Sequence, residues 1–148
     1  MGTLGGSHSV EIAASIETCF DIAADLPGAP RWQGAMKRVE VHETDADGRA
    51  TLITTIADAK VKEIRTVLRF SYQPLGGMRW EQVKGDLKWL RGSWDFEDVG
   101  GLTRATYTME GDPGRILGML IRGPVEHSIR HHLVHLPAEG LKSEAESA

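Results

Sequence analysis

The sequence predicts an α+β protein in which a curved antiparallel sheet of seven strands packs against a long C-terminal helix. Three observations predict this class. Between residues 36 and 110, apolar residues recur at every second position, and short turn sequences separate the alternating runs. The links between these runs are too short for crossovers, so neighbouring strands must be antiparallel. From residue 113 onward the apolar period becomes helical.

A short strand and two short helical segments are predicted near the N-terminus. Apolar residues alternate from Val10 to Ala14, and Ser15 then opens a helix over the stretch ETCFDIAAD. Two prolines prevent residues 26–34 from forming one regular helix, so we expect a connector that carries a buried Trp32. Residues 1–6, which include three glycines, are predicted to be a flexible tail.

The remaining strands form a predicted meander. They are expected at residues 36–44, 49–57, 61–73, 78–84, 87–97 and 102–110. Turn sequences such as Asp47-Gly48 and Gly100-Gly101 lie between them, and such pairs favour tight hairpins. A sheet of this size is expected to twist and curl around the helix that covers it.

The alternation fails once, near Gly85. Leu87 and Trp89 occupy the opposite phase to Trp80 and Leu90. Either a β-bulge near Gly85 or an exposed aromatic side chain would explain this change of phase. The side of the sheet on which Trp89 lies stays open.

The last segment is predicted to be one long amphipathic helix, with Pro113 in its first turn. Its apolar positions recur at helical spacing: Leu117, Ile121, Val125, Ile129, Leu133 and Leu136. Gly123-Pro124 should kink this helix and Pro137 should break it again, because proline lacks a backbone donor.

Composition limits the class of protein. The chain has 148 residues, which suggests a single domain over residues 1–148. A net charge of −4 argues against a nucleic-acid partner. Cys19 is the only cysteine, so no intramolecular disulfide can form, and we expect a cytoplasmic protein. The longest strongly apolar run, Ile116 to Ile121, is far shorter than the ~20 residues of a membrane span, so membrane insertion is not expected.

Many bulky side chains are predicted to converge on the space between the sheet and the helix. The residues expected to line a ligand-binding cavity there are Trp32, Thr66, Leu68, Phe70, Tyr72, Trp80, Trp94, Phe96, Tyr107, Met109, Ser128 and His132. A filled core is the alternative. We favour a cavity because the helix is kinked and carries polar Ser128 and His132 on its inner stripe, where a closed core would place leucine.

The order of these features resembles the START-like, or SRPBCC, superfamily, and most closely its polyketide cyclase/dehydrase branch. The resemblance covers about residues 8–142. It is carried by VEIAAS with Phe20, by DLPGAPRW, by Gly92-x-Trp94-x-Phe96 and by the LKSEAE ending. It implies the helix-grip fold, in which the sheet wraps around the C-terminal helix, and an internal hydrophobic cavity. It does not imply one activity, because this fold hosts ligand carriers, cyclases and hydrolases.

Candidate catalytic groups are few. Tyr72, Tyr107 and His132 are predicted to point inward, where they could polarise a carbonyl group or move a proton. The arginines of the predicted strands fall on the outer face: Arg65, Arg69, Arg79, Arg91 and Arg104. His127, His131 and His135 share one helical stripe, but no carboxylate completes a metal site there. We therefore expect no metal and no cofactor.

The expected function is binding or carriage of a hydrophobic small molecule, by a monomer or a homodimer. Burying about ten methylenes would contribute roughly 8 kcal/mol against association costs of at least ~4 kcal/mol, so a lipid, an isoprenoid or an aromatic polyketide is expected. The alternative is a polyketide aromatase or cyclase that acts in the same cavity, so whether the protein is an enzyme stays open. A third class is an interaction module whose partner covers the mouth of the cavity, which is favoured if Trp89 is exposed beside Val83 and Leu87.

Overall fold

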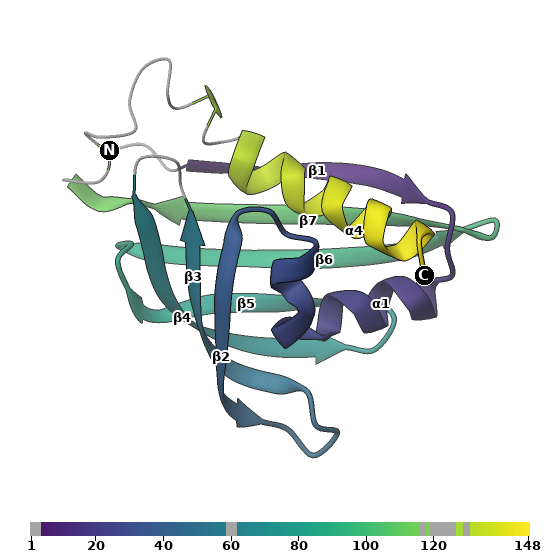
Figure 1. Ribbon diagram of the computed structural model, residues 1–148, viewed down its shortest axis with the longest axis horizontal. Coiled ribbons are helices and arrows are strands. Elements are labelled where there is room, and N and C mark those ends of the chain that lie inside the picture. Colours follow the sequence, from purple (N-terminus) through teal and green to yellow (C-terminus); the bar gives the residue numbers. More distant parts are fainter. Residues whose placement is uncertain (1–3, 59–61, 116–117, 119–126, 129–130) are drawn as a thin grey trace.

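Within the described residues, seven strands form one strongly curved antiparallel sheet (Figure 1). The computed structural model describes residues 4–58, 62–115, 118, 127–128 and 131–148. The strands are β1 Leu4–Ile12, β2 Met36–Thr44, β3 Ala50–Asp58, β4 Glu63–Gln73, β5 Gly77–Gly85, β6 Trp89–Val99 and β7 Leu102–Asp112. They lie in the order β1-β7-β6-β5-β4-β3-β2, so the first strand closes onto the last. This is the predicted helix-grip arrangement.

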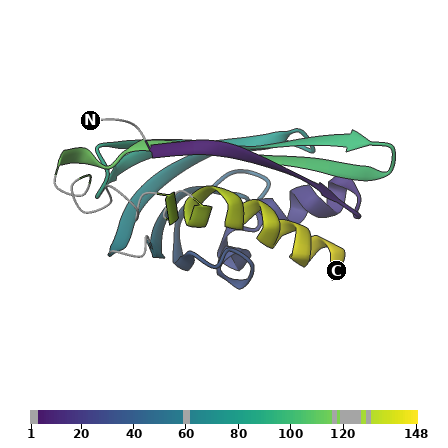
Figure 2. The ribbon, with the colours of Figure 1, turned by 90° about the horizontal axis from the view of Figure 1, so that it is seen from above.

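The described helices lie on one face of the sheet, its concave side (Figure 2). They are α1 Ile16–Ala24, the 3-10 helix η1 Leu26–Arg31, the π-helical turn η2 His131–His135, and α4 Leu136–Glu146. The predicted cap is confirmed, because the Ser15 hydroxyl accepts a hydrogen bond from the Thr18 amide at 3.1 Å. None of these helices is both long enough and apolar enough to cross a membrane.

The start of the chain differs from its prediction. Leu4, Gly5 and Gly6 belong to β1 and pair with β7, so the expected flexible tail is wrong for residues 4–6. The reason is close packing of backbones. A Cβ atom at Gly5 would lie 2.1 Å from the Met109 carbonyl oxygen, so a glycine is required where the sequence suggested only flexibility.

The C-terminal helix is described only in part. The predicted kink at Gly123-Pro124 lies outside the described residues, and so do most of the predicted apolar positions before Leu133. Pro137 does not break the helix in its middle. It lies in the first turn of α4, where its missing N–H costs nothing, and the chain enters this turn from the π-helical η2.

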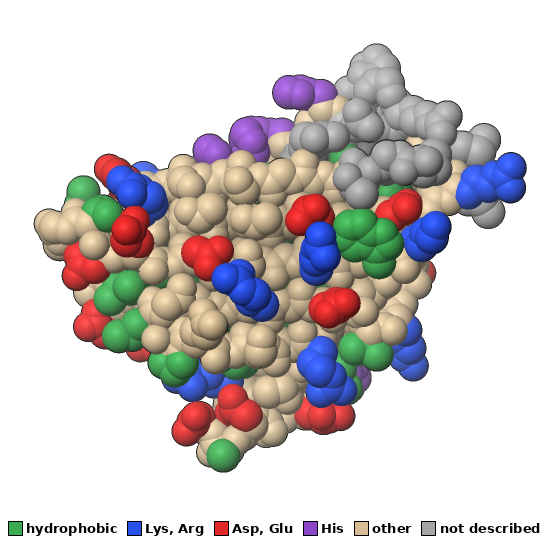
Figure 3. All heavy atoms as spheres, turned by 180° about the vertical axis from the view of Figure 1, so that it is seen from behind, with side chains coloured by type: hydrophobic (Ala, Val, Ile, Leu, Met, Phe, Trp, Pro, Cys, Tyr) green, Lys and Arg blue, Asp and Glu red, His purple; other side chains and the backbone are tan. Residues whose placement is uncertain are grey.

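The predicted faces of the strands are confirmed. In β4 the side chains of Ile64, Thr66, Leu68 and Phe70 are buried while Arg65 and Arg69 are exposed. The outer face carries cross-strand ion pairs at 3.1–3.6 Å, namely Arg79–Asp95, Arg69–Glu43 and Arg91–Glu110. Figure 3 shows this face, with acidic and basic side chains interspersed over it.

The first of the two explanations for the phase change near Gly85, a β-bulge, is confirmed. The pairing of β4 with β5 shifts register at Val83, which is the expected β-bulge. Trp89 is half-buried and its ring lies 5.3 Å from the Arg91 guanidinium carbon. Leu87, in contrast, lines the inner cavity described below. Val83, Leu87 and Trp89 therefore do not form the exposed patch that would favour an interaction module.

Helices α1 and α4 fill one half of the concave face. The Phe20 ring of α1 meets the Phe96 ring of β6 edge-on at 6.3 Å. On the other side, α4 approaches the chain at Trp32 so closely that a Cβ atom at Gly140 would lie 2.0 Å from the Trp32 carbonyl oxygen. The cavity described below lies next to these helices, with Ala23 of α1 and Pro137 of α4 among its lining residues.

Candidate functional site

An apolar cavity of about 130 Å³ lies between the concave face of the sheet and the described helices. All seven strands contribute to its floor and walls. From the helical side it is lined by Ala23 of α1, Leu26 and Ala29 of η1, Leu133 of η2 and Pro137 of α4. Its volume is close to the ~150 Å³ of engineered apolar cavities that bind benzene. The enclosed space thus fits about one aromatic ring.

The lining is almost entirely apolar and carries no charged side chain among the residues that the structure describes. The described lining residues are Leu4, Ala23, Leu26, Ala29, Gln33, Ala35, Met36, Val39, Ile53, Thr55, Ala57, Ile64, Thr66, Leu68, Phe70, Met78, Trp80, Leu87, Leu90, Trp94, Tyr107, Met109, Gly111, Pro113, Leu133 and Pro137. Water in such a space would forgo most of its hydrogen bonds, so an apolar molecule is the favoured occupant.

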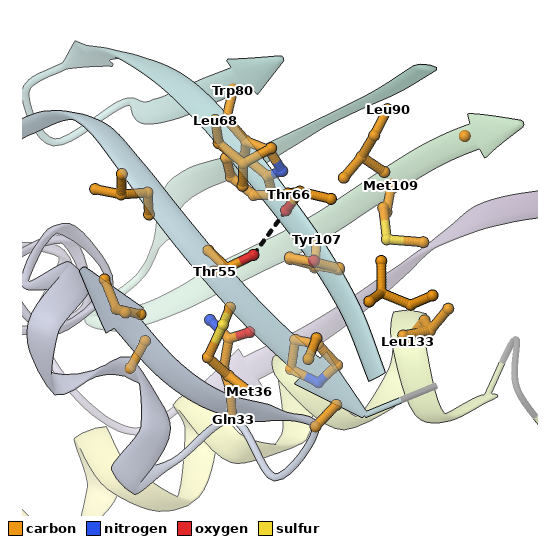
Figure 4. Close-up of a pocket in the computed structure, with 18 of the residues that line it drawn as sticks. Gln33, Met36, Thr55, Thr66, Leu68, Trp80, Leu90, Tyr107, Met109 and Leu133 are labelled. Atoms are coloured by element: carbon orange, nitrogen blue, oxygen red, sulfur yellow. Dashed lines mark hydrogen bonds between the residues drawn. The ribbon is translucent and has the colours of Figure 1, made fainter. Parts of the chain in front are cut away.

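Four neutral polar side chains interrupt this lining (Figure 4). Thr55 and Thr66 face each other across β3 and β4, and their hydroxyl oxygens share a hydrogen bond of 2.7 Å. The Tyr107 ring lies against the rings of Trp94 and Trp80, with centroids 4.9 and 5.7 Å away. Burial is the one cause that raises the pKa of the Tyr107 phenol, so this side chain stays protonated at neutral pH. Gln33 is half-buried at the end of η1.

A glycine shapes the floor of the cavity. Gly92 pairs with Trp80 across β5 and β6, and the Trp80 indole lies over it. A Cβ atom at Gly92 would lie 2.4–2.5 Å from the indole atoms Cε2, Cζ2 and Nε1. Gly92 thus lets the indole lie flat along the sheet, which leaves the space above it open.

Seven of the twelve predicted ligand-binding residues line the cavity, namely Thr66, Leu68, Phe70, Trp80, Trp94, Tyr107 and Met109. Three other predicted residues point inward but do not line it. Trp32 is buried between Gly140 and Trp94, Phe96 packs under α1, and the Tyr72 hydroxyl donates to the Ala50 carbonyl oxygen at 2.6 Å. These side chains lie in the half of the concave face that the helices fill, so they serve the core.

The two predicted residues of the C-terminal segment lie elsewhere. Ser128 is exposed and does not line the cavity. His132 is half-buried, with a buried Nε2 atom, but it does not line the cavity either. The prediction assumed a regular helix, whereas residues 131–135 form a π-helical turn. A turn with more residues rotates the following side chains, and Leu133 reaches the cavity instead.

The sequence analysis missed several lining residues. Gln33 lies in a connector without periodicity, and Thr55 lies in a strand of small residues that gave no clear inner face. The bulge at Val83 hid Leu87, because it reverses the alternation on which the assignment relied. Leu90 shares the inward phase of Trp80 but was not among the predicted lining residues. A hydroxyl at an inward position of a strand, as at Thr55, was the signal available.

The three candidate catalytic residues do not converge. Tyr107 lines the cavity, whereas Tyr72 and His132 do not. Desolvation, with a smaller contribution from Asp45 that Arg49 opposes, raises the pKa of Tyr72 to about 12. The Arg49 guanidinium carbon lies 5.3 Å from the Phe20 ring and 5.8 Å from the Tyr72 ring. This arginine is an exception to the outward placement of arginines, but it contacts the core aromatics and not the cavity.

Histidines gather where β1 meets the C-terminal helical segment. The His8 and His135 rings stack at 4.3 Å, and the His131 ring lies 4.9 Å from His135. Glu139 lies 3.6 Å from the His8 Nε2 atom. No group of three metal-ligating side chains among the described residues is arranged to hold a metal ion. His8, His131 and His135 thus form a packing contact between β1 and η2.

This contact predicts a pH dependence of stability. Desolvation, then the neighbouring His8 and His131, lower the pKa of His135 in the folded chain, although Glu139 opposes this. Near and below the ordinary histidine pKa of about 6.5, the unfolded chain then binds more protons than the folded one. The stabilisation is present above about pH 6.5 and is lost as the pH falls through the lowered value.

We expect the free energy of unfolding in urea to fall between about pH 7.5 and about pH 5.5, a window above most carboxylate titration. The fall should be shallower in H135Q, which cannot take up the proton. Equal slopes in the two proteins would contradict this assignment.

Comparison with known proteins identifies the family of the chain. Residues 5–139 match the family model described as polyketide cyclase / dehydrase and lipid transport. The chain belongs to this family. A comparison with curated proteins finds no significant match.

Solved structures with a similar fold include proteins of several kinds. A START superfamily protein from Mycobacterium smegmatis has a TM-score of 0.83 and 18% identity, with 99% of each chain covered. The Zhui aromatase/cyclase from a Streptomyces species has a TM-score of 0.74 and 16% identity, over 98% of this chain and 94% of that one. A major latex-like protein from Panax ginseng has a TM-score of 0.71 and 10% identity, over 97% of both chains. At these identities the likeness establishes the fold alone.

Proposed function

We propose that the protein binds or carries a hydrophobic small molecule in the cavity between the sheet and the C-terminal helical segment. The observation that supports this most is the cavity itself, which holds about 130 Å³ of apolar space in a chain of 148 residues. Native interiors are packed densely, with few voids larger than a water molecule. A cavity of this size lowers stability unless it has an occupant.

The family supports the same class of ligand. Its description includes lipid transport, and a START superfamily protein is among the structures of similar fold. We propose a monomer or homodimer in the cytoplasm, without a nucleic-acid partner, as expected from the sequence.

A polyketide aromatase or cyclase is the second candidate, because the Zhui aromatase/cyclase has a similar fold. Such an enzyme needs several groups around one reacting atom. Of the three proposed catalytic residues, Tyr107 lines the cavity, whereas the Tyr72 hydroxyl is engaged with the Ala50 carbonyl oxygen. This arrangement favours binding over catalysis.

The test is a titration with a panel of neutral apolar compounds, from benzene-sized rings to sterols, followed through the indole N–H signals in protein NMR spectra. Trp80 and Trp94 line the cavity and should shift, whereas Trp89 on the outer face is an internal reference. We expect saturable shifts for at least one compound.

Two variants on one strand give a matched control. Met109 lines the cavity, and its neighbour Thr108 pairs with Ser93 on the outer face. We expect M109W to fill the cavity and abolish binding, and T108W to retain it. A panel without any saturable shift in the wild-type protein would reject the proposed function.

A further inference from the structure

Provided that the proposed function holds, the polar groups of the cavity indicate the chemical class of the ligand. Tyr107 is only 8% exposed, yet its hydroxyl forms no hydrogen bond with any other residue that the structure describes. Burial is the one cause that raises the pKa of this hydroxyl. The hydroxyl oxygen keeps some accessible surface, and a hydroxyl that a ligand cuts off from water without offering a partner costs about 1–3 kcal/mol. Nine-tenths of this side chain is buried and it lines the cavity, so a bound molecule is the available partner.

The Thr55–Thr66 pair has unused hydrogen-bonding capacity. Each hydroxyl has one proton, and the 2.7 Å contact between the two oxygens uses one of the two protons. The other proton remains for an acceptor in the cavity, because both side chains are 3% exposed. The Gln33 amide, half-buried on the η1 side, adds another donor to the lining.

All of these groups are neutral, and all can donate a hydrogen bond. No lysine, arginine or histidine lines the described part of the cavity, so a carboxylate or phosphate would be desolvated there without a counter-charge. Such burial is strongly unfavourable. The lining therefore discriminates against anions and favours an uncharged acceptor such as a carbonyl oxygen.

The volume of the cavity limits the size of the ligand. The cavity of about 130 Å³ is comparable with those that hold a single benzene ring. Phe70, Trp80 and Trp94 lie along its floor and present ring faces and edges, which aromatic ligands contact favourably.

We propose that the ligand is a compact, uncharged, ring-sized molecule whose carbonyl oxygen accepts a hydrogen bond from the Tyr107 hydroxyl. The Thr55–Thr66 pair and Gln33 are the further donors available to the same oxygen or to a second one. A fatty acid or another anionic amphiphile is disfavoured by the described lining, which offers no counter-charge.

Three probes of matched size test this proposal: acetophenone, which is neutral and has a carbonyl oxygen, ethylbenzene, which is neutral and has none, and benzoate, which is charged. Dissociation constants come from the NMR shifts of the Trp80 and Trp94 indole N–H groups. We expect acetophenone to bind roughly threefold to tenfold more tightly than ethylbenzene, as one net hydrogen bond implies. Benzoate should give no saturable shift.

The matched variant is Y107F, which keeps the ring and removes the hydroxyl. We expect it to bind ethylbenzene as the wild-type protein does and to lose most of the preference for acetophenone. T55V, nearly isosteric, is a second variant in case Y107F does not fold, and it should reduce the same preference.

The outcomes separate this proposal from the proposed function. Equal affinity for acetophenone and ethylbenzene, an unchanged preference in both variants, or tighter binding of benzoate would overturn the inference and leave a hydrophobic ligand possible. Binding of larger panel compounds without any of the three probes would also overturn it. Binding of no compound at all would instead reject the proposed function.

Discussion

Replacing Trp94 by alanine is expected to lower the free energy of unfolding by about 3 to 5 kcal/mol, the range for large buried aromatic side chains. Trp94 is 2% exposed and its ring contacts three others, with centroids 6.1 Å from Trp32, 5.7 Å from Phe96 and 4.9 Å from Tyr107. It joins the filled half of the concave face to the cavity, so its loss affects both. Urea unfolding, with the slope of the transition monitored, measures the effect.

The control for this change is W89A. Trp89 is half-buried on the outer face and contacts Arg91. Apart from the loss of this contact, its replacement should lower the free energy of unfolding by less than about 1 kcal/mol. A loss for W94A as small as that for W89A would show that the Trp94 ring faces empty space and is not packed.

Replacing Gly92 by alanine is expected to weaken binding of any cavity ligand by about tenfold or more. The new Cβ atom would meet the Trp80 indole at 2.4–2.5 Å, so the ring must move. The sheet blocks movement on one side, and the ring must therefore enter the cavity. Such overpacking should also cost about 1–3 kcal/mol of stability.

The matched control is G6A. Gly6 pairs with Met109, which pairs with Gly92, so the two glycines share one row across the sheet. A Cβ atom at Gly6 would meet nothing within 4 Å. G6A should leave affinity unchanged. If G92A bound the same probe as tightly as the wild-type protein, the claim that the position of the Trp80 ring keeps the cavity open would be wrong.

The strands were predictable because their turns require special residues. Gly48, Gly100 and Gly101 have positive φ angles of 84°, 74° and 92°, and each marks a hairpin turn that the sequence analysis identified. Alternation then assigned the inner face of β4 and β7. The same reasoning failed where a glycine serves another purpose, as at Gly5, which permits close backbone contact between β1 and β7.

The cavity was only partly predictable, for a physical reason. Strand periodicity identifies which side chains point inward, but not which half of the concave face the helices fill. Phe96 and Trp94 share the inward phase, yet Phe96 lies under α1 while Trp94 reaches the cavity. The inward-facing side chains of the C-terminal helix were predicted less reliably than those of the strands. The π-helical turn at residues 131–135 rotates His132 away from its predicted place.

The central claim is that the space between the sheet and the C-terminal helical segment receives an apolar molecule. Nuclear Overhauser contacts between a bound neutral ring probe, such as acetophenone, and the assigned methyl groups of the protein test it most directly. We expect contacts to Leu90, Met109 and Leu133, which line the cavity from β6, β7 and η2. Contacts confined to exposed methyl groups such as Val41 and Val83 would contradict the account.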